Sequence, residues 1–100
     1  MDVTVQANGT QAAVSLSGDL DAATAPEFDA ALDPVLDAGA NDITIDVEEL
    51  SFLDSSGLRS LVRARERALA AGGALQLTNA GPAVRRVLEI TRLEEAFGLD

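Results

Sequence analysis

The sequence lacks cysteine, histidine and lysine, and its only aromatic residues are three phenylalanines. Without cysteine or histidine, the chain cannot form a disulfide, a thiolate or imidazole metal site, or a Ser–His nucleophile pair. Without lysine, it has neither a Schiff-base residue nor the lysine of a phosphate-binding loop. An enzyme built from this chain would depend on Asp, Glu, Ser and Arg alone. We therefore expect a protein that is not an enzyme and that uses no metal or cofactor.

Long hydrophobic runs and an N-terminal targeting signal are also missing. No stretch reaches the roughly 18 consecutive apolar residues that a membrane-spanning helix needs. The first residues carry neither the basic segment nor the apolar segment of a signal peptide. We expect a cytoplasmic protein with no membrane insertion. A chain of 100 residues is long enough to bury a core, so we expect one domain over residues 1–100.

Positive charge is scarce and unevenly distributed. The net charge is −10, and the calculated pI is about 4.1. All seven cations lie from Arg59 onward, whereas residues 1–58 hold none. Binding to nucleic acid needs clustered cations, so we expect no direct contact with it. The asymmetry fits an acidic face for a protein partner, and it fits a generally acidic, solvated surface equally well.

The spacing of apolar residues predicts alternating strands and helices. Alternation in residues 1–6 and 12–17, on either side of Asn8-Gly9, predicts a β-hairpin. The order β-β-α-β-α-β-α-α predicts an α/β fold with a mixed central sheet of about four strands, because strand–helix–strand units pair their strands in parallel. The later elements are strands at residues 41–47 and 74–78, helices beginning near Thr24, after Asp54 and at Pro82, and a last short helix at residues 93–97.

Four local signals make more detailed predictions about the helices. Thr24 and Glu27 have the spacing of a capping box at the start of the first helix. Pro34 lies far enough inside that helix to remove a hydrogen bond or bend it. Leu69 in the second helix and Ile90 in the third fall among the apolar residues of their helices, so we expect both to be buried.

The most informative stretch is residues 50–58, Leu-Ser-Phe-Leu-Asp-Ser-Ser-Gly-Leu. Apolar residues lead into an acid, two hydroxyls and a glycine, and a helical pattern follows. This order predicts a strand-to-helix junction with Ser55 and Ser56 in the first turn of the helix. Judged alone, the stretch favours an ordinary N-cap, because Asp and Ser are common cap residues.

Four parts of the chain belong together: residues 54–58, residues 18–21 with Thr24, residues 43–47 and residues 82–88. Together they resemble the STAS domains of bacterial anti-sigma factor antagonists. In order, they are similar to the family signature, its Gly-(Glu/Asp)-Leu-Asp turn, its central strand and its third helix. Arg92 departs from that pattern, in which a glycine often precedes the final leucine.

The resemblance implies a STAS domain that works by binding. Its unphosphorylated form would bind an anti-sigma factor that is also a serine kinase of the GHKL type, and so release a sigma factor. Phosphorylation of Ser55 would end the binding, and a serine phosphatase would restore it. The resemblance further implies partner-binding positions at Asp19, Asp21, Thr24, Asp54, Ser56, Gly57 and Leu58.

Other interpretations differ in the class of protein. A STAS subunit of a lipid transporter, or a stressosome-type scaffold, would use the same fold for docking without a phosphorylation switch. A response-regulator receiver needs a lysine and a longer chain, and a hydrolase needs a base to activate Ser55. For Asp19 and Asp21, three roles remain open: a polar turn that caps the next helix, an acidic rim for a partner's cations, and a two-carboxylate Mg²⁺ site.

Overall fold

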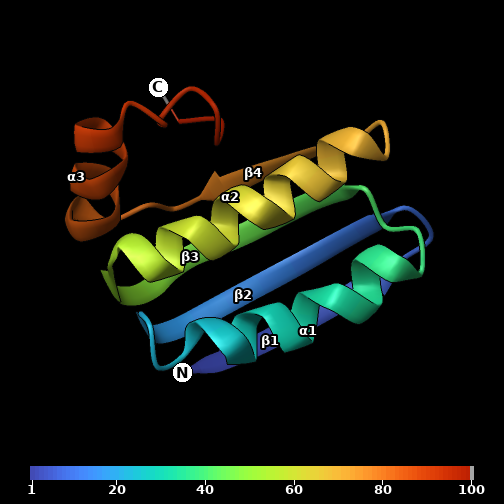
Figure 1. The fold of residues 1–100 in the computed structure, drawn as a ribbon, viewed down its shortest axis with the longest axis horizontal. Coiled ribbons are helices and arrows are strands. Elements are labelled where there is room, and N and C mark those ends of the chain that lie inside the picture. Colours follow the sequence, from blue (N-terminus) through green and yellow to red (C-terminus); the bar gives the residue numbers. More distant parts are fainter. Residues whose placement is uncertain (100) are drawn as a thin grey trace.

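In the computed structural model, which describes residues 1–99, a four-stranded sheet carries two helices across one face (Figure 1). The elements in chain order are β1 (Asp2–Asn8), β2 (Gln11–Leu20), α1 (Ala25–Asp37), β3 (Asp42–Leu53), α2 (Ser55–Ala70), β4 (Ala74–Thr78) and α3 (Pro82–Thr91). The strands lie in the order β1-β2-β3-β4, with β1 antiparallel to β2 and the other pairs parallel. This arrangement confirms the predicted α/β fold with a mixed sheet.

The three parallel strands β2, β3 and β4 end at one edge of the sheet, on the left in Figure 1. Helix α2 begins at this edge, directly after β3, and runs back across the sheet beside α1. Helix α3 lies at the same edge, beyond the end of β4 (Figure 1). The loops that follow parallel strands therefore gather in one place, where sites in α/β folds commonly lie.

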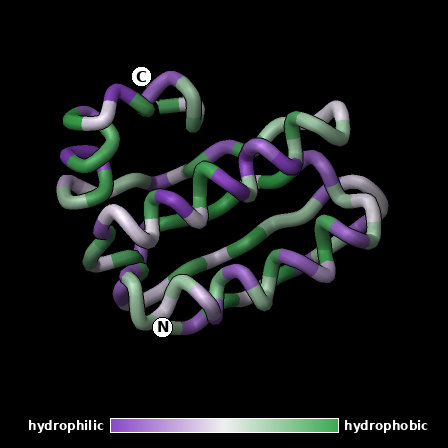
Figure 2. The backbone as a smooth tube through the Cα atoms, viewed as in Figure 1, coloured by the Kyte–Doolittle hydropathy of each residue, from purple (hydrophilic) through white to green (hydrophobic). Residues whose placement is uncertain are grey.

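The core lies between the sheet and the helices α1 and α2, and α3 and the segment after it also contribute to it. Figure 2 shows hydrophobic residues along the strands and, between hydrophilic ones, on the helices. Alternate residues of the strands point into it, because successive side chains of a strand face opposite sides of the sheet. Burying each large apolar side chain contributes about 1.5–3 kcal/mol relative to leaving it exposed. The largest fully buried side chains belong to Phe28, Phe97, Leu16, Leu20, Leu32, Ile43, Ile45, Leu61, Leu75, Leu88, Val14 and Val47.

The start of α1 differs from the predicted capping box. Thr24 occupies the N-cap position, but its side chain makes no cap hydrogen bond to the helix. Its backbone is helical, with φ −104° and ψ −15°, rather than extended as at a usual N-cap. Its hydroxyl instead accepts a hydrogen bond from the Asp21 N–H at 2.9 Å and donates one to the Asp19 carbonyl at 2.7 Å. The Thr24 hydroxyl is therefore hydrogen-bonded within the preceding turn, and it does not form the capping box.

Pro34 does not end α1, which continues to Asp37. The missing N–H removes the hydrogen bond to the carbonyl of Ala30, and Ala30 is exposed, so no buried polar group is left unsatisfied. The helix closes at Gly39, which has a φ of +106° just after the C-cap Ala38. A left-handed residue in this position is the usual end of a helix, and glycine adopts it without strain.

Two residues predicted to be buried are exposed. Leu69 is 44% exposed, and Ile90 is 73% exposed. At about 100° per residue, Leu69 is turned about 100° from the buried Ala68, and Ile90 about 200° from the buried Leu88. The spacing of apolar residues therefore identified the buried face of each helix but assigned one residue too many to it.

The segment after α3 forms turns rather than the predicted short helix at residues 93–97. Arg92 ends α3 in the left-handed conformation, with φ +59°, and so turns the chain back. The Phe97 carbonyl then accepts a hydrogen bond from the N–H of Leu77 on β4 at 2.9 Å, and the Phe97 ring is fully buried. One helix-like hydrogen bond remains, from the Phe97 N–H to the Leu93 carbonyl at 3.1 Å, but the chain continues as turns and is anchored to β4.

Candidate functional site

The junction between β3 and α2 is held against the end of β2. Strand β3 runs to Leu53, well beyond the predicted residue 47, because β2 pairs with it over its whole length. Leu20 lies opposite Leu53 and Asp19 lies opposite Phe52 in this pairing. The Asp54 N–H then donates to the Leu20 carbonyl at 3.3 Å. The acidic turn after β2 is thereby brought next to the start of α2.

Asp54 is the N-cap of α2. Its backbone is extended, and its Oδ1 accepts a hydrogen bond from the Gly57 N–H at 2.9 Å. A side-chain cap of this kind contributes about 1 kcal/mol to stability. The helix therefore begins at Ser55, and both serine hydroxyls lie in its first turn, as predicted from the sequence.

Gly57 allows the first turn of α2 to pack closely against the backbone of β2. A Cβ atom at this position would collide with the Leu20 carbonyl group. This close approach is made by the backbone of this chain's own Leu20. Gly57 and the neighbouring Leu58 are both buried. They hold the first turn in place and present no surface of their own to a partner.

Ser55 and Ser56 differ in accessibility. Ser55 is exposed, and its hydroxyl makes no hydrogen bond within residues 1–99. Ser56 is half-buried. The hydroxyl of Ser55 is therefore exposed to solvent and free of hydrogen bonds to the described residues. It lies in a helical turn that Asp54 and Gly57 hold in place.

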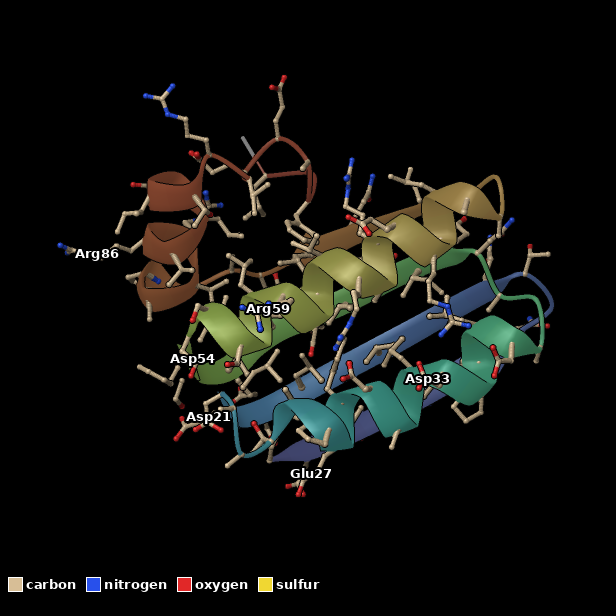
Figure 3. All side chains as sticks on the ribbon, viewed as in Figure 1. Asp21, Glu27, Asp33, Asp54, Arg59 and Arg86 are labelled. Carbon is tan, nitrogen blue, oxygen red and sulfur yellow. The ribbon has the colours of Figure 1, made fainter. Side chains whose placement is uncertain are left out.

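The acidic turn between β2 and α1 places Asp19 and Asp21 in different roles. The Asp21 Oδ1 accepts hydrogen bonds from the N–H groups of Ala23 and Thr24, at 3.0 and 3.1 Å. Its carboxylate thus shapes the turn, and Figure 3 shows it at the same end of the molecule as Asp54. The Asp19 carboxylate is exposed and forms no ion pair or hydrogen bond among the described residues. Of the two, Asp19 is the carboxylate available to a partner.

Phe52 is a surface residue that sequence reasoning did not single out. Its side chain is 49% exposed, although it belongs to the apolar lead-in to the junction. The buried residues of this part of β3 are Leu50 and Leu53, which are three positions apart. Irregular register between β2 and β3 interrupts the usual alternation here and turns Phe52 outward.

The described residues offer no metal centre or membrane span. Within residues 1–99, no group of three or more His, Cys, Asp or Glu side chains is placed to hold a metal ion. No helix in that part of the chain is long and apolar enough to cross a membrane.

Comparisons with known proteins place the chain in a family. A family model described as "Mlab, STAS domain" matches residues 3–99. The chain is 30% identical over 99 residues to the anti-sigma-B factor antagonist of Bacillus subtilis (strain 168), covering 99% of this chain and 90% of that protein. The chain therefore belongs to the STAS domain family.

Solved structures with the same fold include further antagonists. An anti-sigma factor antagonist from Mycobacterium paratuberculosis superimposes with a TM-score of 0.85 at 31% identity, covering 98% of this chain and 83% of that one. The Bacillus cell fate determinant SpoIIAA in its phosphorylated form gives a TM-score of 0.77 at 23% identity, covering 95% of this chain and 87% of that one. The second likeness is one of fold alone.

Proposed function

We propose that this chain is an anti-sigma factor antagonist controlled by phosphorylation of Ser55. The unphosphorylated form binds an anti-sigma factor that is also a serine kinase of the GHKL type, and this binding releases a sigma factor. Phosphorylation of Ser55 ends the binding, and a serine phosphatase restores it. The observation that carries the proposal concerns the hydroxyl of Ser55, which is exposed and makes no hydrogen bond within residues 1–99. It lies in a helical turn held by Asp54 and Gly57.

The relatives support the general role. The proteins from Bacillus subtilis and Mycobacterium paratuberculosis are named as antagonists of anti-sigma factors, and each matches nearly the whole of this chain. SpoIIAA has the same fold and exists in a phosphorylated form. A phosphoryl group is therefore compatible with this fold in at least one other protein.

In the proposed reaction, this chain supplies only the nucleophile. The Ser55 Oγ attacks the γ-phosphorus of ATP, the bond from that phosphorus to ADP breaks, and the hydroxyl proton passes to a base of the kinase. The chain contains no His or Lys to act as that base. The nearest carboxylate in sequence, Asp54, is already hydrogen-bonded to the Gly57 N–H. ATP, Mg²⁺ and the base therefore belong to the kinase.

The surface around Ser55 combines charge with an apolar anchor. Asp19 has an exposed carboxylate that could bind a cation of the partner. Phe52 lies opposite Asp19 in the strand pairing, and its side chain is 49% exposed. Aromatic side chains that become fully buried often dominate the energy of an interface. Asp54 and Ser56, both half-buried, complete the contact beside Ser55.

The remaining implied positions act by supporting this surface. Asp21 and Thr24 maintain the turn that carries Asp19 through their mutual hydrogen bonds. Gly57 and Leu58 hold the start of α2 from inside the molecule. Changes at these four positions would weaken binding by displacing Ser55 or Asp19.

Phosphorylation would act on the interface rather than on the fold. The phosphoryl group adds a charge of about −1.5 to −2. The N-terminus of α2 favours this charge by about 0.3–1 kcal/mol, while nearby Asp54 opposes it. A partner surface shaped for a neutral hydroxyl would instead leave the dianion unpaired, at a cost of several kcal/mol. That cost corresponds to at least about a hundredfold loss of affinity.

Incubation with GHKL kinases from the same genome tests the proposal. We expect one kinase to add about 80 Da, the mass of a single phosphoryl group, and peptide mapping to place it on Ser55. Ser55→Ala should remain unmodified, whereas the matched control Ser56→Ala should be phosphorylated. Modification of Ser55→Ala to the same extent as the parent would contradict the assignment. Stable binding to a partner with no modification by any kinase would favour docking without a phosphorylation switch.

A further inference from the structure

The outer face of α2 carries a row of residues spaced four apart. Arg59, Arg63 and Arg67 are all exposed, and the spacing places them one above another along the helix. Ser55 occupies the next position of the same row, one turn before Arg59. The proposed phosphorylation site is therefore the first member of a row that otherwise consists of guanidinium groups.

The facing helix α1 carries a matching row of carboxylates. Arg63 pairs with Asp29 at 2.9 Å, and Arg67 pairs with Asp33 at 2.9 Å and with Asp37 at 2.6 Å. The first two pairs each join residues 34 positions apart in the sequence. The two rows thus run in register along the neighbouring helices.

Arg59 is the member of its row that faces no carboxylate. The same offset places it opposite Ala25, a buried alanine in the first turn of α1. Among residues 1–99, Arg59 forms no ion pair and no side-chain hydrogen bond. Figure 3 shows it on the N-terminal half of α2, at the end of the molecule that carries Asp54. If Ser55 were phosphorylated, its phosphoryl group would be the anion nearest to Arg59 in this row.

We propose that Arg59 binds the phosphoryl group of Ser55 once that residue is modified. This inference rests on the proposed function for the presence of the group. Side chains four apart on a helix have Cβ atoms about 6 Å from each other, and an anion placed N-terminal to its cation is the more favourable order. The guanidinium fork matches two oxygens of a phosphoryl group and stays charged at any working pH.

The contact gives Arg59 a positioning role. It orients the phosphoryl group along α2 and offsets the repulsion from Asp54, whose carboxylate lies at the N-cap. The dianion gains more from a neighbouring cation than the monoanion does. Binding by Arg59 therefore lowers the second pKa of the phosphoryl group, which is near 6 in an unperturbed phosphoserine.

A titration by ³¹P NMR tests this contact without any kinase. The full chain is made with phosphoserine incorporated at position 55, alone and combined with Arg59→Gln, Arg59→Lys or Arg86→Gln. Arg86 is a matched control, because it is exposed on α3 and points away from the molecule (Figure 3). We expect Arg59→Gln to raise the second pKa by about 0.2–0.4 unit, and Arg86→Gln by less than about 0.1. Arg59→Lys, which keeps the charge, should recover part of the difference.

Equal shifts in Arg59→Gln and Arg86→Gln, or no shift in either, would overturn the inference, because the effect would then be one of overall charge or absent. Circular dichroism of each phosphorylated variant checks that the fold is retained. The outcome of the titration does not depend on the proposed function, because the phosphoserine is incorporated directly. A kinase that never modifies Ser55 leaves the titration unchanged, and a failed titration leaves phosphorylation by a kinase possible.

Discussion

Helices α2 and α3 both begin at the edge where the parallel strands end, but their first turns are held in different ways. At α2, the Asp54 side chain caps the helix, and Gly57 lies against the Leu20 carbonyl. At α3, the N-cap is Gly81, which makes no side-chain cap hydrogen bond, and the first residue is Pro82. Two anchors fix the turn that carries Ser55, whereas the start of α3 has proline geometry and one exposed hydrogen bond, from the Arg85 side chain to the Ala80 carbonyl at 3.2 Å.

Under the proposed function, the difference explains why the junction at Ser55, rather than the similar one before α3, is the one that a partner recognises. A reactive group must be presented in one geometry if another protein is to act on it. The first turn of α2 meets that condition because contacts from two directions restrain it. Removing these contacts one at a time, and comparing each loss with that at a position where no such contact exists, tests this difference.

The largest effect is expected from Gly57→Ala, with Gly81→Ala as its control. A methyl group at residue 57 would collide with backbone atoms of Leu20, whereas one at residue 81 would meet nothing within 4 Å. We expect Gly57→Ala to lower the free energy of unfolding by about 2–3 kcal/mol and Gly81→Ala by less than about 1 kcal/mol. Urea denaturation measures both values. Equal losses would show that the contact with Leu20 does not hold the turn.

A smaller effect is expected at the cap. Asp54→Ala removes the acceptor for the Gly57 N–H and should cost about 1 kcal/mol in unfolding free energy. Asp54→Asn keeps a cap acceptor without the charge, so its stability should stay close to that of the parent. If both variants lost the same amount, the charge of Asp54 rather than its hydrogen bond would stabilise the turn.

The smallest effect is expected along the exposed ion pairs between α1 and α2. A double-mutant cycle with Arg63→Gln and Asp29→Asn should give a coupling of about 0.2–1 kcal/mol that decreases with added salt. The side chain of Arg63 is 59% exposed, so solvent screens the pair. A coupling well above this range and insensitive to salt would mean that the pair, like the first turn of α2, is a main anchor.

Much of the fold could be predicted because its signals are local. The alternation in residues 1–6 and 12–17, the helical spacing and the junction at Asp54 each follow from a few neighbouring residues. The contacts made at a distance could not be predicted. The true length of β3, the outward turn of Phe52 and the collision point at Gly57 all depend on how β2 pairs with β3.

The same distinction applies to the site. The position of Ser55 in the first turn followed from the sequence, but the separate roles of Asp19 and Asp21 did not. Only the folded turn shows that backbone N–H groups occupy the Asp21 carboxylate while that of Asp19 is exposed. The capping box expected at Thr24 was wrong because the same turn uses its hydroxyl.

The central claim is that a charge on Ser55 ends the binding of an anti-sigma factor while the fold survives. The most direct test measures the affinity of one anti-sigma factor kinase for the parent chain, Ser55→Asp and Ser55→Ala by calorimetry. We predict that Ser55→Ala binds like the parent, and that Ser55→Asp binds about a hundredfold more weakly with an unchanged unfolding midpoint. Equal affinities for Ser55→Asp and the parent would contradict the account.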